Sequence, residues 1–112
     1  MTMEYVKFED FKKLQLKIAK VLKVEDHPNA DKLYVLTVTT GTGEAEKTIV
    51  AGIKMHYKPE ELIGKQVVII DNLEPAVIRG VASNGMLLAT KDGTSLAVLT
   101  PDREITTGSP VS

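Results

Sequence analysis

The sequence predicts a small all-β domain, and three observations lead to this fold class. Most of the chain divides into short apolar runs rich in β-branched residues, separated by Gly, Asn, Asp and Pro. A helical pattern appears only near the N-terminus and around Pro59. With 112 residues, of which 43% are hydrophobic, the chain is long enough for one compact domain and too short for two ordinary ones. We therefore expect residues 1–112 to form a single domain.

Residues 8–24 fit two periodicities. Apolar residues recur at helical spacing with lysines opposite, at Phe8, Phe11, Leu14, Ile18, Val21 and Leu22. The second half of the segment also alternates and is rich in β-branched residues, which favours a strand there. We expect a short helix over 8–13 and a strand over 14–25. Lys20 falls out of phase with the alternation, so a β-bulge near Ala19-Lys20 is expected.

Residues 33–51 predict a β-hairpin. The run 33–40 is β-rich, Gly41-Thr42-Gly43-Glu44 has the composition of a turn, and 47–51 is a second apolar run. The next segment, 54–64, breaks the strand rhythm. Pro59 is followed by two glutamates, and a glycine comes just past Leu62, which is typical of a single helical turn.

Three further strands are expected in the last half of the chain, over 66–71, 86–90 and 95–99. The first is buried, and the last two are joined by a hairpin turn at Lys91-Asp92-Gly93-Thr94. Residues 72–85 are expected to form a long irregular loop.

Three strands, a short helical insertion and two or more further strands are typical of a Greek-key barrel of the OB type. We therefore predict an all-β OB-fold barrel with a short N-terminal helix and a short helical insertion. Such barrels bind oligonucleotides on an open face flanked by two loops, which here are residues 27–33 and 72–85. Each loop offers small or amide side chains and one cation, Lys32 or Arg79. This composition suits contact with a phosphate-bearing polymer.

The composition gives little support for catalysis or for a bound cofactor. The chain has no cysteine, its two histidines lack the spacing of a metal site, and no serine lies in a nucleophile elbow. No phosphate-cradling glycine motif is present. We expect no cofactor, no metal and no enzymatic activity. The N-terminus lacks the order of a signal peptide and no apolar run is long enough to cross a membrane, so a cytoplasmic protein is expected.

Charge and aromatic content shape the expected mode of binding. The net charge of −1 is unusual for a nucleic-acid-binding domain, but five lysines fall between Phe11 and Val24 with no acid among them. A local basic face is one interpretation of this run, and a solvated surface is the other. Few aromatic residues are available for base stacking. Shape and phosphate recognition of a folded RNA is therefore favoured over threading of a single strand.

Several ordered motifs strongly resemble the tRNA-binding domain family. They are His27-Pro28-Asn29-Ala30-Asp31-Lys32-Leu33-Tyr34-Val35, Ile49-Val50-Ala51-Gly52-Ile53, Tyr57-Lys58-Pro59-Glu60-Glu61-Leu62-Ile63-Gly64-Lys65, Asn72-Leu73-Glu74-Pro75, Ile78-Arg79-Gly80-Val81, Ser83-Asn84-Gly85-Met86-Leu87-Leu88-Ala89 and Leu99-Thr100-Pro101-Asp102. The resemblance covers roughly Tyr5 to Val111. The family includes the C-terminal domain or beta subunit of methionyl-tRNA synthetase, free-standing structure-specific tRNA-binding proteins, and the C-terminal domains of the Arc1p and EMAP II type.

The resemblance implies an OB barrel that binds tRNA by shape without reading the anticodon and serves as a dimerising domain or beta subunit of methionyl-tRNA synthetase. The implied partners are tRNA, a second copy of the chain and the synthetase catalytic subunit. The matching binding positions are Asn29, Lys32, Lys54, Arg79, Ser83 and Met86. Asn29 fits turn architecture equally well, and Met86 fits the core equally well.

Two departures from the family pattern weaken the expected binding. Gln15-Leu16-Lys17-Ile18-Ala19 stands where an Asp-x-Arg-Val-Gly type of pattern is common, and Ala76-Val77 stands where a lysine usually precedes the Arg-Gly pair. The second departure removes one expected phosphate contact.

A homodimer is expected to use apolar surface near both ends of the chain, at Phe8, Phe11, Leu14, Leu96, Val98 and Val111. A competing interpretation places Phe8 and Phe11 over the open end of the chain's own barrel. Two other functions stay open. One is a protein-binding chaperone or secretion-related homodimer on the same barrel, marked by an apolar groove in place of the Lys32/Arg79 rim. The other is structural dimerisation with no useful RNA affinity.

Overall fold

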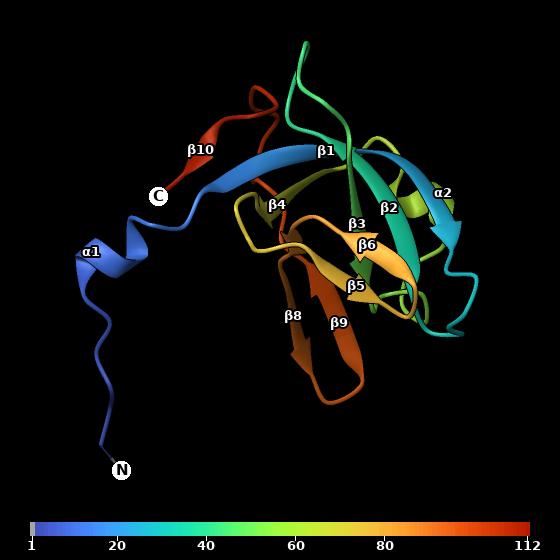
Figure 1. Cartoon of the computed structure of the whole chain (residues 1–112), viewed down its shortest axis with the longest axis horizontal. Coiled ribbons are helices and arrows are strands. Elements are labelled where there is room, and N and C mark those ends of the chain that lie inside the picture. The colour runs from blue at the N-terminus through green and yellow to red at the C-terminus, as the bar shows by residue number, and fades with distance from the viewer. Residues whose placement is uncertain (1) are drawn as a thin grey trace.

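The computed structural model describes residues 2–112 and is mostly β-structure (Figure 1). Within these residues two short helices and ten strands follow one another. Their order is α1 (Phe8–Phe11), β1 (Leu16–Asp26), β2 (Tyr34–Thr39), β3 (Lys47–Ala51), α2 (Pro59–Leu62), β4 (Gln66–Ile70), β5 (Ala76–Ile78), β6 (Val81–Ser83), β7 (Met86–Leu87), β8 (Ala89–Asp92), β9 (Ser95–Val98) and β10 (Pro110–Val111). The main antiparallel sheet has the order β3-β2-β1-β4-β7, and β10 pairs with β1.

The long strand β1 curls this sheet into a barrel. Its first half pairs with β4 and its second half with β2, so the strand serves both sides of the sheet. A register shift between Val21 and Lys23 leaves Leu22 and Lys23 exposed side by side. The predicted bulge therefore exists, but it lies two to three residues beyond Ala19-Lys20. At the other edge, β3 packs against β6 and β7, which nearly closes the barrel and confirms the predicted OB-type fold.

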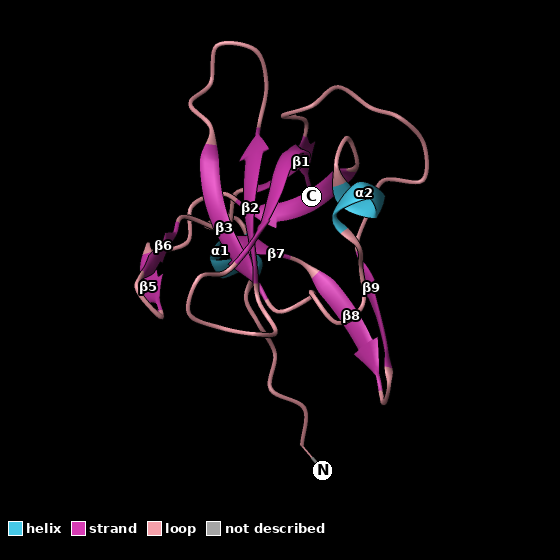
Figure 2. Ribbon diagram, turned by 90° about the vertical axis from the view of Figure 1, so that its right-hand side faces the viewer, coloured by secondary structure: helices cyan, strands magenta, loops and turns pink. Residues whose placement is uncertain are grey.

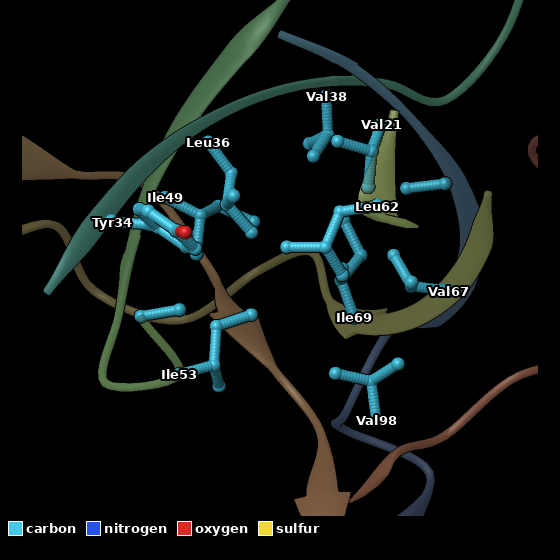
Figure 3. Close-up of a cluster of buried hydrophobic side chains, with 12 residues drawn as sticks. Val21, Tyr34, Leu36, Val38, Ile49, Ile53, Leu62, Val67, Ile69 and Val98 are labelled. Carbon is cyan, nitrogen blue, oxygen red and sulfur yellow. The ribbon is translucent and has the colours of Figure 1, made fainter. Parts of the chain in front are cut away.

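One hydrophobic cluster fills the barrel (Figure 3). It takes alternate residues from the curled strands, and Tyr34, Leu36 and Val38 from β2 are all buried. The helical turn α2 adds Leu62, which is fully buried. Pro59 begins that turn, and the Glu61 carboxylate accepts a hydrogen bond from the Lys58 main-chain N–H at 2.8 Å.

Most predicted elements are confirmed, and two are wrong. The N-terminal helix, the hairpin β2–β3, the turn α2, and strands β4 and β9 lie where they were expected. Residues 72–85 are not an irregular loop, because they contain the hairpin β5–β6. The strand predicted over 86–90 is split into β7 and β8, which belong to different sheets. The pairing of β10 with β1 was not predicted. No helix within residues 2–112 has the length and apolar character needed to span a membrane.

Helix α1 stands apart from the barrel (Figure 1), and none of its residues is buried. Phe8 and Phe11 stack on each other with ring centroids 6.5 Å apart, while Phe8 stays 71% exposed. The interpretation in which these rings cap the chain's own barrel is therefore wrong. The Asn72 side chain fixes the segment that follows α1. It accepts a hydrogen bond from the Gln15 N–H at 2.8 Å and donates one to the Lys13 carbonyl at 2.7 Å.

Asp71, at the end of β4, links three strands through two lysines. Its carboxylate lies 3.1 Å from the Lys17 ammonium of β1 and 2.6 Å from the Lys47 ammonium of β3. Lys47 also donates a hydrogen bond to the Asp71 main-chain oxygen at 2.7 Å. Burial alone would raise the pKa of Asp71, but the hydrogen bonds and charges of Lys47 and Lys17 outweigh it and lower the pKa below its usual value.

We expect Asp71→Asn to lower the free energy of unfolding by about 1–3 kcal/mol at neutral pH, because it removes the charge from a part-buried pair of ionic hydrogen bonds. The lowered folded-state pKa means that the stabilisation is fully present above the unfolded-state pKa of about 3.9 and is lost as pH falls through the folded value. The difference in free energy of unfolding between wild type and Asp71→Asn should therefore become smaller below about pH 4, as measured by denaturant titrations. Asp102→Asn, which affects only an exposed pair with Arg103, is the matched control. A difference in free energy of unfolding that stays the same in acid would contradict stabilisation by the ionised Asp71 carboxylate.

Candidate nucleic-acid interface

The two loops that flank the open face are held against each other by His27. This side chain is only 5% exposed, and both of its ring nitrogens are engaged. Nδ1 accepts a hydrogen bond from the Asn29 main-chain N–H at 2.9 Å, which leaves the proton on Nε2. Nε2 then donates to the Ile78 carbonyl at 2.8 Å. One imidazole ring therefore shapes the first loop and binds it to the hairpin β5–β6.

Asn29 and Arg79 complete this connection with a reciprocal pair of hydrogen bonds. The Asn29 side-chain amide donates to the Arg79 carbonyl, and the Arg79 guanidinium donates to the Asn29 carbonyl, each at 3.1 Å. Together with the two bonds of His27 they make up what we call the loop clasp. The clasp joins residues about fifty positions apart in the sequence, and it confirms that the two polar loops share one surface.

Arg79 sits at the tip of a two-residue hairpin. Ile78 pairs directly with Val81, and the two residues between them have positive φ values, +49° for Arg79 and +89° for Gly80. Positive φ at both central positions is the pattern of a type I′ turn, whose twist matches that of the flanking strands. An arginine in this conformation is uncommon. The turn and the clasp together therefore fix the direction of the Arg79 side chain.

The rim formed by these loops carries two cations without a carboxylate partner. Lys32 and Arg79 are exposed, and no salt bridge within residues 2–112 involves either of them. They line one shallow depression together with Ala30, Asp31 and Leu33. Lys54 lies near the base of the first loop, but it pairs with Asp26 at 3.2 Å, so much of its charge is already balanced. Lys32 and Arg79 therefore provide the main positive charge of the rim.

Ser83 and Met86 take different positions from each other. Ser83 is buried; its hydroxyl accepts a hydrogen bond from the Val50 N–H at 3.0 Å and donates one to the Gly85 carbonyl at 3.3 Å. These bonds attach β6 to β3, so we assign Ser83 to the framework and no longer expect it to contact a ligand. Met86 is 46% exposed and lies at an apolar groove beside the hairpin.

The remaining predicted residues do not gather in one place. Phe8, Phe11 and Leu14 are exposed on or next to α1, and Val111 pairs with Leu16. Val98 is a buried member of the barrel core and cannot form an interface, which corrects that expectation. Leu96 packs partly against the same core and lines the apolar groove. The run of lysines in 12–23 does not form a free basic face, because Lys13, Lys17 and Lys23 pair with acids.

The sequence did not predict the role of His27, because a lone histidine carries no spacing signal. The one local signal is its position before a Pro-Asn turn, where a side-chain acceptor can bond the turn's own amide. Within residues 2–112 no group of three His, Cys, Asp or Glu side chains is placed to hold a metal ion. The site therefore consists of two cations without carboxylate partners among the described residues, on loops that hydrogen bonds hold together.

Comparison with known proteins agrees with this arrangement. The family model described as "Putative tRNA binding domain" matches residues 16–110 of this chain. The chain belongs to the tRNA-binding domain family. The match begins with β1 and ends with β10, so it includes both loops and the clasp but not α1.

Relatives and solved structures show the same kinship. Methionine–tRNA ligase of Pyrococcus horikoshii is 56% identical over 109 residues, which are 97% of this chain and 15% of that protein. The Thermotoga maritima enzyme is 50% identical over 96% of this chain and 17% of its own length. This chain thus spans about one sixth of the ligases that it matches.

Two solved structures cover the whole fold. A MetRS-related protein from Pyrococcus horikoshii has a TM-score of 0.89 at 34% identity and covers 98% of this chain and 100% of its own. The chaperone CsaA from Bacillus anthracis has a TM-score of 0.86 at 30% identity and covers 97% of this chain and 100% of its own. Both neighbours therefore share the barrel.

The clasp makes a direct prediction about His27. We expect its neutral ring to be the Nε2–H tautomer, and long-range proton–nitrogen NMR spectra would identify it. His27→Ala should lower the free energy of unfolding by about 1–3 kcal/mol, because it leaves the part-buried Asn29 N–H and Ile78 carbonyl without their partners. His56→Ala is the control, and it should change stability by less than about 0.5 kcal/mol because, unlike His27 with its two side-chain hydrogen bonds, the His56 side chain makes none within residues 2–112. An Nδ1–H tautomer would exclude the clasp as described.

Proposed function

We propose that this chain is a non-catalytic module that binds folded tRNA through the rim of the clasped loops and works in the cytoplasm beside, or as part of, methionyl-tRNA synthetase. Residues 1–112 act as one tRNA-binding domain in this proposal. The observation that supports this proposal most strongly is that the loop clasp holds two cations without carboxylate partners in residues 2–112, Lys32 and Arg79, on one surface. The family membership and the ligase relatives support tRNA as the ligand.

The rigidity of the rim favours recognition of RNA shape. Phosphate contacts carry no sequence information, whereas reading base edges needs forked donors aimed into a groove. The only other arginine, Arg103, lies outside both loops and pairs with Asp102. Since the clasp fixes the rim before binding, little ordering entropy opposes association. A rigid phosphate-binding surface fits a folded RNA better than a flexible strand.

Binding should depend on salt in proportion to the phosphates neutralised. The log–log slope falls by about 0.7–0.9 for each phosphate contact, so the two rim cations give a slope of roughly −1.4 to −1.8 for one chain and about twice that for a dimer that engages both rims. We expect Lys32→Ala and Arg79→Gln each to flatten the slope by about one. Lys91→Ala, an exposed cation on the separate hairpin β8–β9, is the matched control and should leave it unchanged.

Fluorescence anisotropy with a labelled tRNA transcript at several salt concentrations measures these slopes. Equal slopes for wild type, Lys32→Ala and Arg79→Gln would show that neither residue contacts a phosphate of the tRNA. A slope that becomes flatter only in Lys91→Ala would place the tRNA-binding site on the hairpin β8–β9 instead.

A second function is supported by the likeness to CsaA and by an apolar groove that lies beside the rim. In that alternative the chain binds an extended apolar peptide. The groove was expected in place of the cationic rim, but the structure has both. The uncompensated cations favour RNA, because an apolar peptide gains nothing from them.

We also propose that the chain forms a homodimer through α1. The stripe formed by Phe8, Phe11 and Leu14 is exposed. The hydrogen bonds of the Asn72 side chain fix the segment that joins this stripe to β1. The β10 strand lies beside the start of β1, so both ends of the chain are on the same side (Figure 1). A second copy can cover this surface by two-fold symmetry, and the dimer would present two rims to one tRNA.

We expect Phe11→Ala to convert the dimer into a folded monomer, because α1 contributes nothing to the core of its own barrel. Loss of a central aromatic at an interface typically costs about 2 kcal/mol or more. Light scattering gives the mass, and circular dichroism verifies folding. Val77→Ala, which truncates another exposed apolar side chain, on β5 and away from α1, is the control. A Phe11→Ala protein that remains dimeric would exclude this stripe as the interface.

A further inference from the structure

The apolar groove beside the rim has the size and chemistry of a ligand site. It encloses about 370 Å³ between β3, the hairpin β5–β6 and the start of the β7–β9 segment. Small-molecule sites commonly span about 300–1,000 Å³. Its walls are mainly apolar and come from Val50, Ile53, Ile78, Met86, Leu87 and Leu96. The views in Figures 1 and 2 place β5–β6 next to β3 along this side of the barrel.

The groove and the cationic rim adjoin the same hairpin, β5–β6. Ile78 lines the groove, and the next residue, Arg79, lines the depression at the rim. A ligand that crosses the hairpin β5–β6 would therefore meet a cation first and an apolar surface second. A nucleotide has this order of chemistry, since its phosphate is anionic and the faces of its base are apolar.

Charge inside the groove fixes the orientation of such a ligand. Glu74 is the one charged residue among those that line it, and no lining residue is a cation. The Glu74 carboxylate repels a phosphate but accepts a hydrogen bond from an exocyclic amino group, as acidic side chains do with cytosine. The groove therefore suits the base, and the rim suits the phosphate.

The edge of β3 offers further polar groups to the ligand. Along this edge the Thr48 carbonyl and the Val50 N–H meet the β6–β7 segment, through Asn84 N–H at 2.8 Å and Ser83 Oγ at 3.0 Å. By strand alternation Gly52 presents its main-chain groups on the same edge. Gly52 also lines the groove, and no other residue described in 2–112 forms a hydrogen bond with it.

We propose that this groove binds one unstacked base of the RNA, with a preference for a base that carries an exocyclic amino group, while the adjoining phosphates contact Lys32 and Arg79. The proposal rests on the proposed function and adds to it a subsite for a base. In this arrangement the protein contacts a base as well as phosphates, although the rim has no aromatic ring on which a base can stack. Met86, at the mouth of the groove, supplies a flexible thioether against the base face.

The methyl group of Met86 reports directly on the groove. The chain has four methionines, so a protein labelled with ¹³C at the methionine methyl groups gives few signals to assign. We expect tRNA to shift the Met86 signal upfield, because a base face lies over the methyl group. Met55, which is 69% exposed and does not line the groove, is the internal control and should not move.

A groove-filling variant tests the contribution to affinity. Ala76 is exposed on β5 and lines the groove, so Ala76→Leu should occupy the space without disturbing the core. We expect a loss of about tenfold in tRNA affinity, the scale of one good base contact. Ala97→Leu is the matched control, because Ala97 is also exposed on a strand, β9, and lies outside this groove. Cytidine monophosphate should shift Met86 at lower concentration than uridine monophosphate, and Glu74→Ala should remove this preference.

The outcomes separate this proposal from the proposed function. If wild type binds tRNA and Lys32→Ala weakens it, while Met86 does not move and Ala76→Leu binds normally, the groove proposal is overturned and the rim stands. If wild type does not bind tRNA, both are overturned. If an extended apolar peptide moves Met86 and tRNA does not, the groove binds peptide and the proposal is wrong.

Discussion

The loop clasp is the constraint on which the binding surface depends. Residues 27–33 and the hairpin β5–β6 come from distant parts of the chain, and side-chain hydrogen bonds hold them together. His27 does this with a neutral ring that accepts from one loop and donates to the other. Asn29 and Arg79 then exchange hydrogen bonds at the surface. The loops lose their conformational entropy during folding and not during binding, so the rim is already formed when a ligand arrives.

Electrostatics of this chain must be considered locally. Its net charge of −1 argues against nucleic-acid binding only if charges are averaged over the surface. Many lysines are committed to structure, as Lys17 and Lys47 are to Asp71 and Lys54 is to Asp26. Lys32 and Arg79 have no such partner in the described chain. A small number of uncompensated cations on a rigid rim can attract phosphate while the rest of the protein stays neutral.

The strands were predictable because their signals are local. Alternating residues in 33–40 and the glycines of 41–44 specify a hairpin through side-chain period and turn geometry, and Pro59 specifies a helical turn through its fixed φ. The hairpin β5–β6 was missed because its strands have three residues each and its turn contains Arg79, which propensity does not favour at positive φ. The same limit applies to β10, whose two residues pair with β1 only in the folded state.

The site was predictable in its charges and less so in its framework. Lys32 and Arg79 were expected at the edges of two loops, and the structure brings those loops together. The sequence could not show that Ser83 is used internally or that Val98 belongs to the core, because burial depends on packing between distant segments. His27 was missed for the same reason, since the Ile78 carbonyl that it binds is fifty-one residues away.

The central claim is that a preformed rim recognises the shape of folded tRNA, and a competition measurement tests it most directly. A labelled tRNA bound to the full chain is displaced by several unrelated tRNAs and by a single-stranded RNA of equal length, all at one salt concentration. The account predicts that the tRNAs compete within a few-fold of one another and that the single strand competes more weakly. Equal competition by the single strand, or preference for one tRNA by about a hundredfold, the scale of base-specific readout, would contradict it.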